Sequence, residues 1–431
     1  MACRRKNLIW YGAIITPFVI AFIYLVITDR ANDKSEEPIT LDRILSDLDE
    51  KEPGWRLEDL EAQRQAIPDE ENGALCVLAA HKLMGEKRPI LPRGGPFDVY
   101  WDRPLDENIA EFLVEQINQF RPALTEAHRL EKLPSGRYPV SYPEYGLFGR
   151  EARRQPVRDI LDLLEIEGIV QIHTGHLNEA WQTCLAILNA SRSLGDEPVA
   201  DSQYLRMEIR QKAVDGIIEI LKRGEIPVAE LFTTLKLLEN ESGYPLIQVL
   251  LRAQRANEHR FWTELDAGRL DVTQTFGISK ESVSSDRPFW AGQKLDRHAG
   301  ALYYLSRVIE LLKLPLAEQD KAFKELQREN YGGAFSVYTE SVISFEKANH
   351  TKLDQAIIAL AAERYRLNNH RWPELMSDMI PKYLPNAPLD PVDGKPILYR
   401  RLREGILIYA KKSQRGNESE ILIPENRRNS E

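Results

Sequence analysis

Cysteine is scarce in this chain, with 3 residues among 431. The sequence also has no Cys-x-x-Cys, Gly-x-Ser-x-Gly or Gly-x-Gly-x-x-Gly motif and no phosphate-binding loop, so it carries no familiar redox, nucleophile or nucleotide signature. Cys76 and Cys184 could form one disulfide in an oxidising compartment. Because Cys184 lies in the apolar helical pattern AWQTCLAILNA, we favour a buried thiol that behaves as a small hydrophobic residue.

Most of the chain has no excess of either charge sign, although the formal net charge is −9. Residues 29–72 contain 15 acidic and 6 basic side chains, and the remaining body is close to neutral. Such a body lacks the excess of basic residues that is typical of nucleic-acid-binding proteins. With 43% hydrophobic and 29% charged residues, the composition also excludes a disordered chain and a membrane protein with many spans.

The strongest feature is the apolar run at residues 8–28, whose 21 residues include no charge. As a helix it would be roughly 30 Å long, which is the thickness of the hydrocarbon core of a bilayer. Basic residues 4–6 precede it and favour a cytoplasmic N-terminus with the body on the extracytoplasmic side. A cleaved signal peptide is the alternative, but residues 28–30 (Thr-Asp-Arg) offer no small-x-small cleavage site. We therefore expect one uncleaved span in the cytoplasmic or inner membrane.

Proline and glycine punctuate a helical pattern between residues 157 and 268. Proline suits the first helical position, and glycine suits the position just after the last one. Short connections between such helices predict antiparallel pairs, as in a bundle or an α-solenoid. Residues 175–188, GHLNEAWQTCLAIL, resemble the second helix of a tetratricopeptide repeat, although no strict period recurs. The helices expected in this region are 157–173, 177–194, 198–224, 227–242 and 245–267.

The best metal-ligand pattern is His173 and His176, followed by Glu179. Histidine and glutamate are zinc ligands, but Gly175 should end the helix between the two imidazoles, and no clear third ligand follows. A polar turn between helices is the simpler interpretation. The tyrosine- and proline-rich residues 133–156 are expected to form an extended strap over neighbouring helices, with a ligand groove as the alternative.

Residues 384–401, LPNAPLDPVDGKPILYRR, place four prolines and an Asp-Gly pair ahead of a β-like run. Prolines fix φ, and Asp393 with the following glycine favours a tight turn. Asp390 and Asp393 could instead hold a metal, but turn chemistry alone accounts for both. Strands are expected at 395–402, 405–412 and 419–425, after a helix that ends near residue 368.

The segment ALAAERYRLNNHRWPEL…YLPNAPLDPVDGKPILYRR…GILIYA resembles the soluble half of type II secretion major pseudopilins over residues 353–424. In that family a helix ending in Tyr, Asn and an aromatic-Pro pair precedes a Pro-x-Asp-Pro turn and β-strands. A weaker resemblance covers most of the chain. It is to uncharacterised, membrane-anchored proteins of planctomycete-type bacteria, in which a helical body with a GxLxxAW helix precedes the same ending.

Three features depart from the pseudopilin pattern. The chain lacks the pre-pilin peptidase site, its apolar run has no glutamate, and a long helical region separates that run from the C-terminal segment. Major pseudopilins also bind calcium near their last strands. The matching residues 411–420 have only Glu418 and Glu420 as acids beside three basic side chains, which does not suit calcium.

The sequence therefore predicts a mainly α protein. It comprises a cytoplasmic stub and transmembrane anchor at 1–28, an acidic linker at 29–71 that we expect to be a flexible tether, a repeat-like helical body at 72–345, and a pseudopilin-like helix with a three-stranded antiparallel sheet at 346–431. We expect a non-enzymatic interaction or scaffold protein of the cell envelope whose partners are the membrane and another envelope protein. A helical metal-dependent hydrolase or lyase outside the cytoplasm is the alternative. We assign no catalytic, cofactor-binding or metal residue; the alternatives are His173, His176, Glu179, Asp390 and Asp393.

Overall fold

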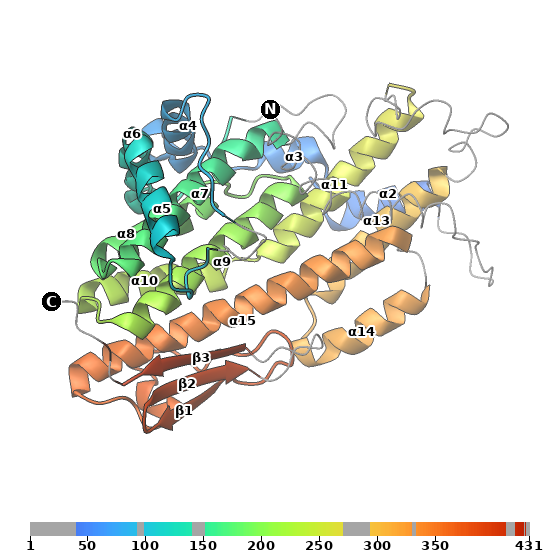
Figure 1. Ribbon diagram of the computed structural model, residues 1–431. Coiled ribbons are helices and arrows are strands. Elements are labelled where there is room, and N and C mark those ends of the chain that lie inside the picture. The colour runs from blue at the N-terminus through green and yellow to red at the C-terminus, as the bar shows by residue number, and fades with distance from the viewer. Residues whose placement is uncertain are drawn as a thin grey trace. The chain divides into compact units, whose positions relative to one another are not determined.

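The computed structural model describes residues 40–92, 99–139, 151–269, 294–329, 333–410, 419–425 and 427. It is mainly helical and has a small sheet near the C-terminus (Figure 1), as the sequence predicts. Short 3-10 helices are η1 (Asp69–Glu71), η2 (His128–Lys132) and η4 (Met376–Met379). The α-helices are α2 (Leu41–Lys51), α3 (Leu57–Ala62), α4 (Gly73–Leu83), α5 (Glu107–Gln119), α6 (Arg121–Ala127), α7 (Glu151–His173), α8 (Leu177–Arg192), α9 (Ala200–Arg223), α10 (Val228–Ser242), α11 (Leu246–Asp266), α13 (Lys294–Leu311), α14 (Leu316–Glu329) and α15 (Gly333–Asn369).

Glycine ends several helices, as predicted. Gly175, Gly195 and Gly268 have φ of 82°, 57° and 69°, the left-handed conformation that favours glycine after a helix. Gly224 follows α9 in extended conformation instead, with φ of −164°. The expected start of the helix at residue 157 is wrong, because α7 begins at Glu151 and includes Pro156.

The chain forms two compact units, one of residues 1–56 and 258–344 and the other of residues 57–257 and 345–431. In the first unit α2 packs on α13 around a small core of Ile44, Leu48, Trp55, Ala299 and Leu302. Residues 41–71 therefore form helices and bury apolar side chains, so this stretch is not the flexible tether that its acidic composition predicts.

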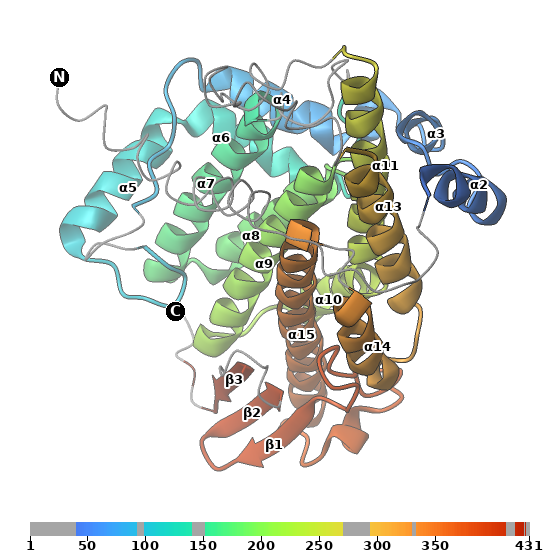
Figure 2. The ribbon, with the colours of Figure 1, turned by 90° about the vertical axis from the view of Figure 1, so that its right-hand side faces the viewer.

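The second unit contains a large apolar core. α8 packs between α7 and α9 (Figures 1 and 2), and apolar residues from α4 to β3 belong to the same cluster. On α15, the three- and four-residue spacing of Leu353, Ile357, Leu360, Ala361 and Tyr365 predicts one core face. All of residues 353–363 are buried and Tyr365 is partly buried, so this part of the helix is covered on every side. The C-terminal segment therefore shares its core with the helical body.

Trp101 lies against two glycines on neighbouring helices. A Cβ atom on Gly168 of α7 would lie 2.6 Å from the indole, and one on Gly216 of α9 would lie 3.2 Å from it. The Gly216 Cβ would also lie 2.5 Å from Sγ of Cys184. Glycine at these two positions lets the indole approach both helix backbones.

The sheet has the order β1-β2-β3 and is antiparallel throughout. Its strands are β1 (Leu398–Leu402), β2 (Gly405–Ala410) and β3 (Ser419–Pro424), which confirms the predicted meander. Ile406 pairs with Ile423, and Ile408 pairs with Ile421. All four side chains are buried, on the face that joins the core. The strands lie beside the C-terminal part of α15 in both views (Figures 1 and 2).

No helix that the structure describes is both long and apolar enough to cross a bilayer. The run at 8–28, for which we predict a span, lies outside the described residues.

Candidate functional site

The predicted histidine pair lies in a turn. His173 is the last residue of α7, and His176 immediately precedes α8. Nδ1 of His176 lies 2.8 Å from Oγ1 of Thr174, and Gly175 turns the chain between the two histidines. Glu179 lies in the first turn of α8, where the partial positive charge of the helix N-terminus stabilises a carboxylate. Local turn contacts thus account for this motif.

The predicted aspartate pair shapes the proline-rich bend. Oδ1 of the buried Asp390 accepts hydrogen bonds from the Val392 amide at 2.9 Å and from Oγ1 of Thr351 at 3.0 Å. Oδ1 of Asp393 accepts one from the Lys395 amide at 2.9 Å. The bend is therefore built by turn chemistry, and Thr351 joins it to α15. Among the described residues, no group of three or more His, Cys, Asp or Glu side chains is placed to hold a metal ion.

The structure brings together a cluster that the sequence analysis missed. Ser242, the last residue of α10, donates from Oγ to Oδ1 of Asp354 at 2.8 Å, and the same Oγ lies 3.1 Å from Nε2 of His350. Nδ1 of His350 lies 3.9 Å from Oε1 of Glu346. Arg210 on α9 in turn binds both oxygens of Glu346, at 2.8 and 2.7 Å. We call these five residues the Ser242 cluster.

The environment shifts the pKa values of the two carboxyl groups in opposite directions. Burial raises the pKa of Asp354, and the charge of Asp390 adds to the increase against the opposing effects of His350 and Ser242. Burial also disfavours the Glu346 carboxylate, but Arg210 and His350 outweigh that cost and lower its pKa. Oppositely shifted pKa values beside a serine and a histidine are a feature of many catalytic sites, so the cluster is the best chemical candidate in the described residues.

Two features oppose a nucleophilic role for Ser242. Its single hydroxyl proton is donated to Asp354, whereas a serine nucleophile donates to its histidine base. Ser242 also ends α10, and the C-terminal end of a helix carries partial negative charge that disfavours an alkoxide or an oxyanion. The geometry supports a polar junction between α10 and α15 better than an activated serine.

Further ion pairs extend this junction to α8 and α9. Glu241 precedes Ser242 and binds Nη2 of Arg206 at 3.1 Å and Nε of Arg192 at 3.2 Å. The Arg206 guanidinium carbon lies 4.0 Å from the centre of the Tyr244 ring. Because Glu241 is 2% exposed, its two arginine partners are needed to offset the cost of burying its charge.

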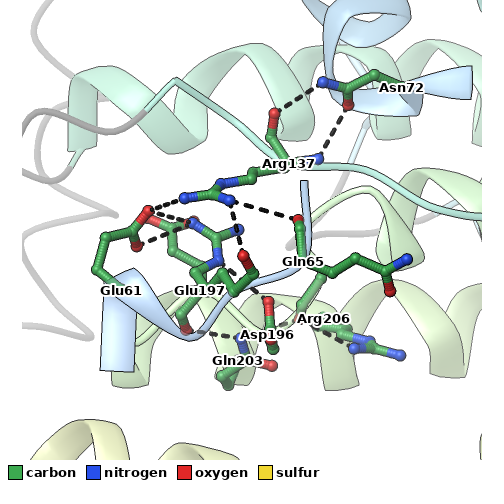
Figure 3. A network of polar contacts seen from close by, with 10 residues as sticks. Glu61, Gln65, Asn72, Arg137, Asp196, Glu197, Gln203 and Arg206 are labelled. Atoms are coloured by element: carbon green, nitrogen blue, oxygen red, sulfur yellow. Dashed lines mark hydrogen bonds and ion pairs between the residues drawn. The ribbon is translucent and has the colours of Figure 1, made fainter. Parts of the chain in front are cut away.

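A second polar network holds the strap that the sequence predicts from residue 133 (Figure 3). The Asn72 side chain donates to the carbonyl of Arg137 and accepts from its amide, both at 2.9 Å. Arg137 and Arg64 both bind Glu61, at 2.9 and 3.1 Å, and Nε of Arg64 donates to Asp196 at 3.0 Å. Residues 140–150, which contain the other tyrosines of the strap, lie outside the described residues.

A third polar group surrounds His128, which borders an open cavity of about 330 Å³. Its Nδ1 donates to Glu131 at 2.7 Å and its Nε2 donates to Glu167 at 2.6 Å. Burial alone would lower the pKa of His128, but hydrogen bonds and charge from these two carboxylates raise it to about 10. The imidazolium has both N–H groups satisfied within the protein, which leaves it none for a ligand.

Comparisons with known proteins found no match for this chain among protein-family models, curated proteins or solved structures.

Proposed function

We propose that the chain is a membrane-anchored, non-enzymatic interaction or scaffold protein of the cell envelope. The observation that carries the proposal is the charge-free run at 8–28 behind basic residues 4–6. Its length suits a single span, and the basic flank suits a cytoplasmic N-terminus with the body on the other side.

The helical body supports an interaction role. α7, α8 and α9 pack consecutively, which supports the repeat-like interpretation and offers an extended surface for a partner. The sequence resemblance of residues 353–424 to the soluble half of major pseudopilins extends the proposal, as an analogy, to a secretion-type assembly. Several large apolar side chains of the second unit are exposed and provide positions at which a partner can be sought: Leu83, Ile90, Phe112, Val114, Val228, Phe232, Leu375, Leu389 and Leu422.

The test uses a photo-crosslinking amino acid in the full chain in intact cells. We expect specific crosslinks to an envelope protein from at least one of Phe112, Phe232 and Leu375. Position Lys321, whose side chain is 84% exposed, serves as the polar control. The absence of a specific crosslink from all three apolar positions would contradict the proposal. Truncation is unsuitable here, because removing the end of α15 would remove buried core residues.

One contact favours a second candidate, a hydrolase acting outside the cytoplasm: the 3.1 Å distance between Oγ of Ser242 and Nε2 of His350. A fluorophosphonate, which labels activated serines, tests it. Labelling of the purified chain that disappears in both Ser242→Ala and His350→Ala variants would establish this candidate. Because Ser242 ends its helix and donates to Asp354, we expect no labelling.

A further inference from the structure

Four side chains on the second unit form an alternating stack of aromatic rings and cations. The guanidinium carbon of Arg364 lies 4.8 Å from the ring centre of Phe232 and 5.7 Å from that of Tyr383. Nζ of Lys382 lies 5.1 Å from the Tyr383 ring centre. We call Phe232, Arg364, Tyr383 and Lys382 the aromatic–cation patch. It joins α10, α15 and the segment after η4.

Phe232 and Lys382 are exposed and Arg364 is partly exposed, whereas Tyr383 is buried, with 5% of its surface exposed. Phe232 is 47% exposed, and Val228, one helical turn earlier on α10, is 41% exposed. Covering the exposed part of the Phe232 ring would contribute a favourable hydrophobic term to binding. An exposed aromatic and a neighbouring valine beside two cations are typical of a surface that a partner covers.

Arg364 is a cation without a carboxylate partner among the described residues. Its neighbour Arg366 binds both Glu363 and Glu225, whereas Arg364 contacts the two rings and its buried Nε has no hydrogen-bond acceptor. The charge of Glu239 reaches Arg364, but that carboxylate binds Lys236 at 2.6 Å. Guanidinium groups bind carboxylates through paired hydrogen bonds, so an acidic group on a partner would complement this position.

The Tyr383 side chain is held in place before any partner binds. Its hydroxyl accepts from the side-chain amides of Asn368 and Asn369, each at 3.3 Å. The Tyr365 ring packs edge-on against it, with the centres 5.5 Å apart. Because Arg364 and Lys382 both contact this fixed ring, they lose less conformational freedom on binding a partner.

We propose that the aromatic–cation patch binds an acidic protein segment that also carries an apolar side chain. The acidic groups would bind Arg364 and Lys382, and the apolar side chain would cover Phe232 and Val228. This inference rests on the proposed interaction function and specifies the chemistry of the partner.

The first experiment measures fluorescence anisotropy of a labelled synthetic peptide with the full chain in nanodiscs of neutral lipid. The peptide combines glutamates with leucines, and its counterpart replaces each glutamate with lysine. We expect saturable binding of the acidic peptide that weakens with added salt. Arg364→Met and Phe232→Ser should each weaken it about tenfold. Phe112→Ser, on α5 and 38% exposed in the parent chain, should leave it unchanged, and thermal unfolding verifies that each variant folds.

Three results of the peptide-binding experiment would overturn the proposal. They are the absence of saturable binding, equal binding of the lysine peptide, and full binding by a folded Arg364→Met chain. Arg364-dependent binding to anionic phosphatidylglycerol vesicles without peptide binding would also overturn it, by assigning the patch to a lipid surface. In cells, crosslinks from position 112 but not from 228 would reject this surface and leave the interaction function standing. Failure at every position would reject both.

Discussion

Nη2 of Arg427 donates a hydrogen bond of 2.7 Å to Oε2 of Glu363, a carboxylate whose side chain has no exposed surface. Arg366 binds the same carboxylate through Nε and Nη2, each at 3.0 Å. Both guanidinium groups lie over the ring of Trp372, at 5.2 and 5.4 Å. Nη1 of Arg427 also donates to two carbonyls near the end of α9. A residue beyond β3 is thereby joined to α9 and α15.

We predict that Glu363→Gln lowers the free energy of unfolding by about 3 kcal/mol, because it leaves two arginines near an uncharged group in a buried site. Chemical denaturation of the purified chain measures this. Glu310→Gln is the matched control, since Glu310 pairs with Lys313 at a side-chain exposure of 65% and should change stability by less than about 1 kcal/mol. Equal effects of the two changes would contradict the prediction.

Gly168→Ala should destabilise the protein by about 1–3 kcal/mol, since the added methyl group would overlap the Trp101 ring and force repacking. The measurement is thermal or denaturant unfolding, with tryptophan fluorescence as the reporter. Gly243→Ala is the control. Its Cβ would have no neighbour closer than 3.6 Å, and its φ of −75° suits alanine. A Gly168→Ala variant with unchanged stability would contradict the prediction, because it would show that the indole can move away at little cost.

His128 should make stability fall at alkaline pH. Its pKa of about 10 in the folded chain exceeds the ordinary value of 6.5, so the contribution is complete below pH 6.5 and is lost as pH rises toward 10. We expect His128→Gln to remove at least about 1 kcal/mol of this dependence. NMR titration checks the cause directly. An imidazole that loses its proton near pH 6.5 in the folded protein would contradict the prediction.

Lys236→Cys tests the proposed topology. The Lys236 side chain is 57% exposed, while Cys76 and Cys184 are buried, so a membrane-impermeant maleimide should label the new thiol selectively once Cys3 is replaced by serine. We expect labelling in intact spheroplasts. A thiol at position 236 that reacts only after lysis would place the body in the cytoplasm and overturn the localisation.

Local chemistry made much of the fold predictable. The helix ends at Gly175, Gly195 and Gly268 follow from the backbone freedom of glycine, and the three strands follow from alternating apolar residues between turns. The acidic composition of residues 41–71 wrongly predicted a flexible tether, because composition does not reveal that Trp55 packs against Ala299 and Leu302, which are distant in the sequence.

The Ser242 cluster was only partly visible in the sequence. Glu346, His350 and Asp354 are spaced four residues apart, so they lie on one face of a helix, and that polar stripe was a usable signal. Their partners were not predictable. Ser242 is 108 residues away from His350 and Arg210 is 136 away from Glu346, and only packing of α9 and α10 against α15 joins them.

The buried thiols impose a condition on how the protein is made. Burial raises the pKa of Cys76 to about 11 and that of Cys184 further still, and because the thiolate is the reactive form, folding disfavours oxidation at these sites. The newly exported, unfolded chain has no such protection. If the body folds outside the cytoplasm, as proposed, the thiols are protected only after α4 has packed around Cys76 and α8 around Cys184. The rate of folding, more than the final stability, then sets how long the two thiols are exposed to oxidants.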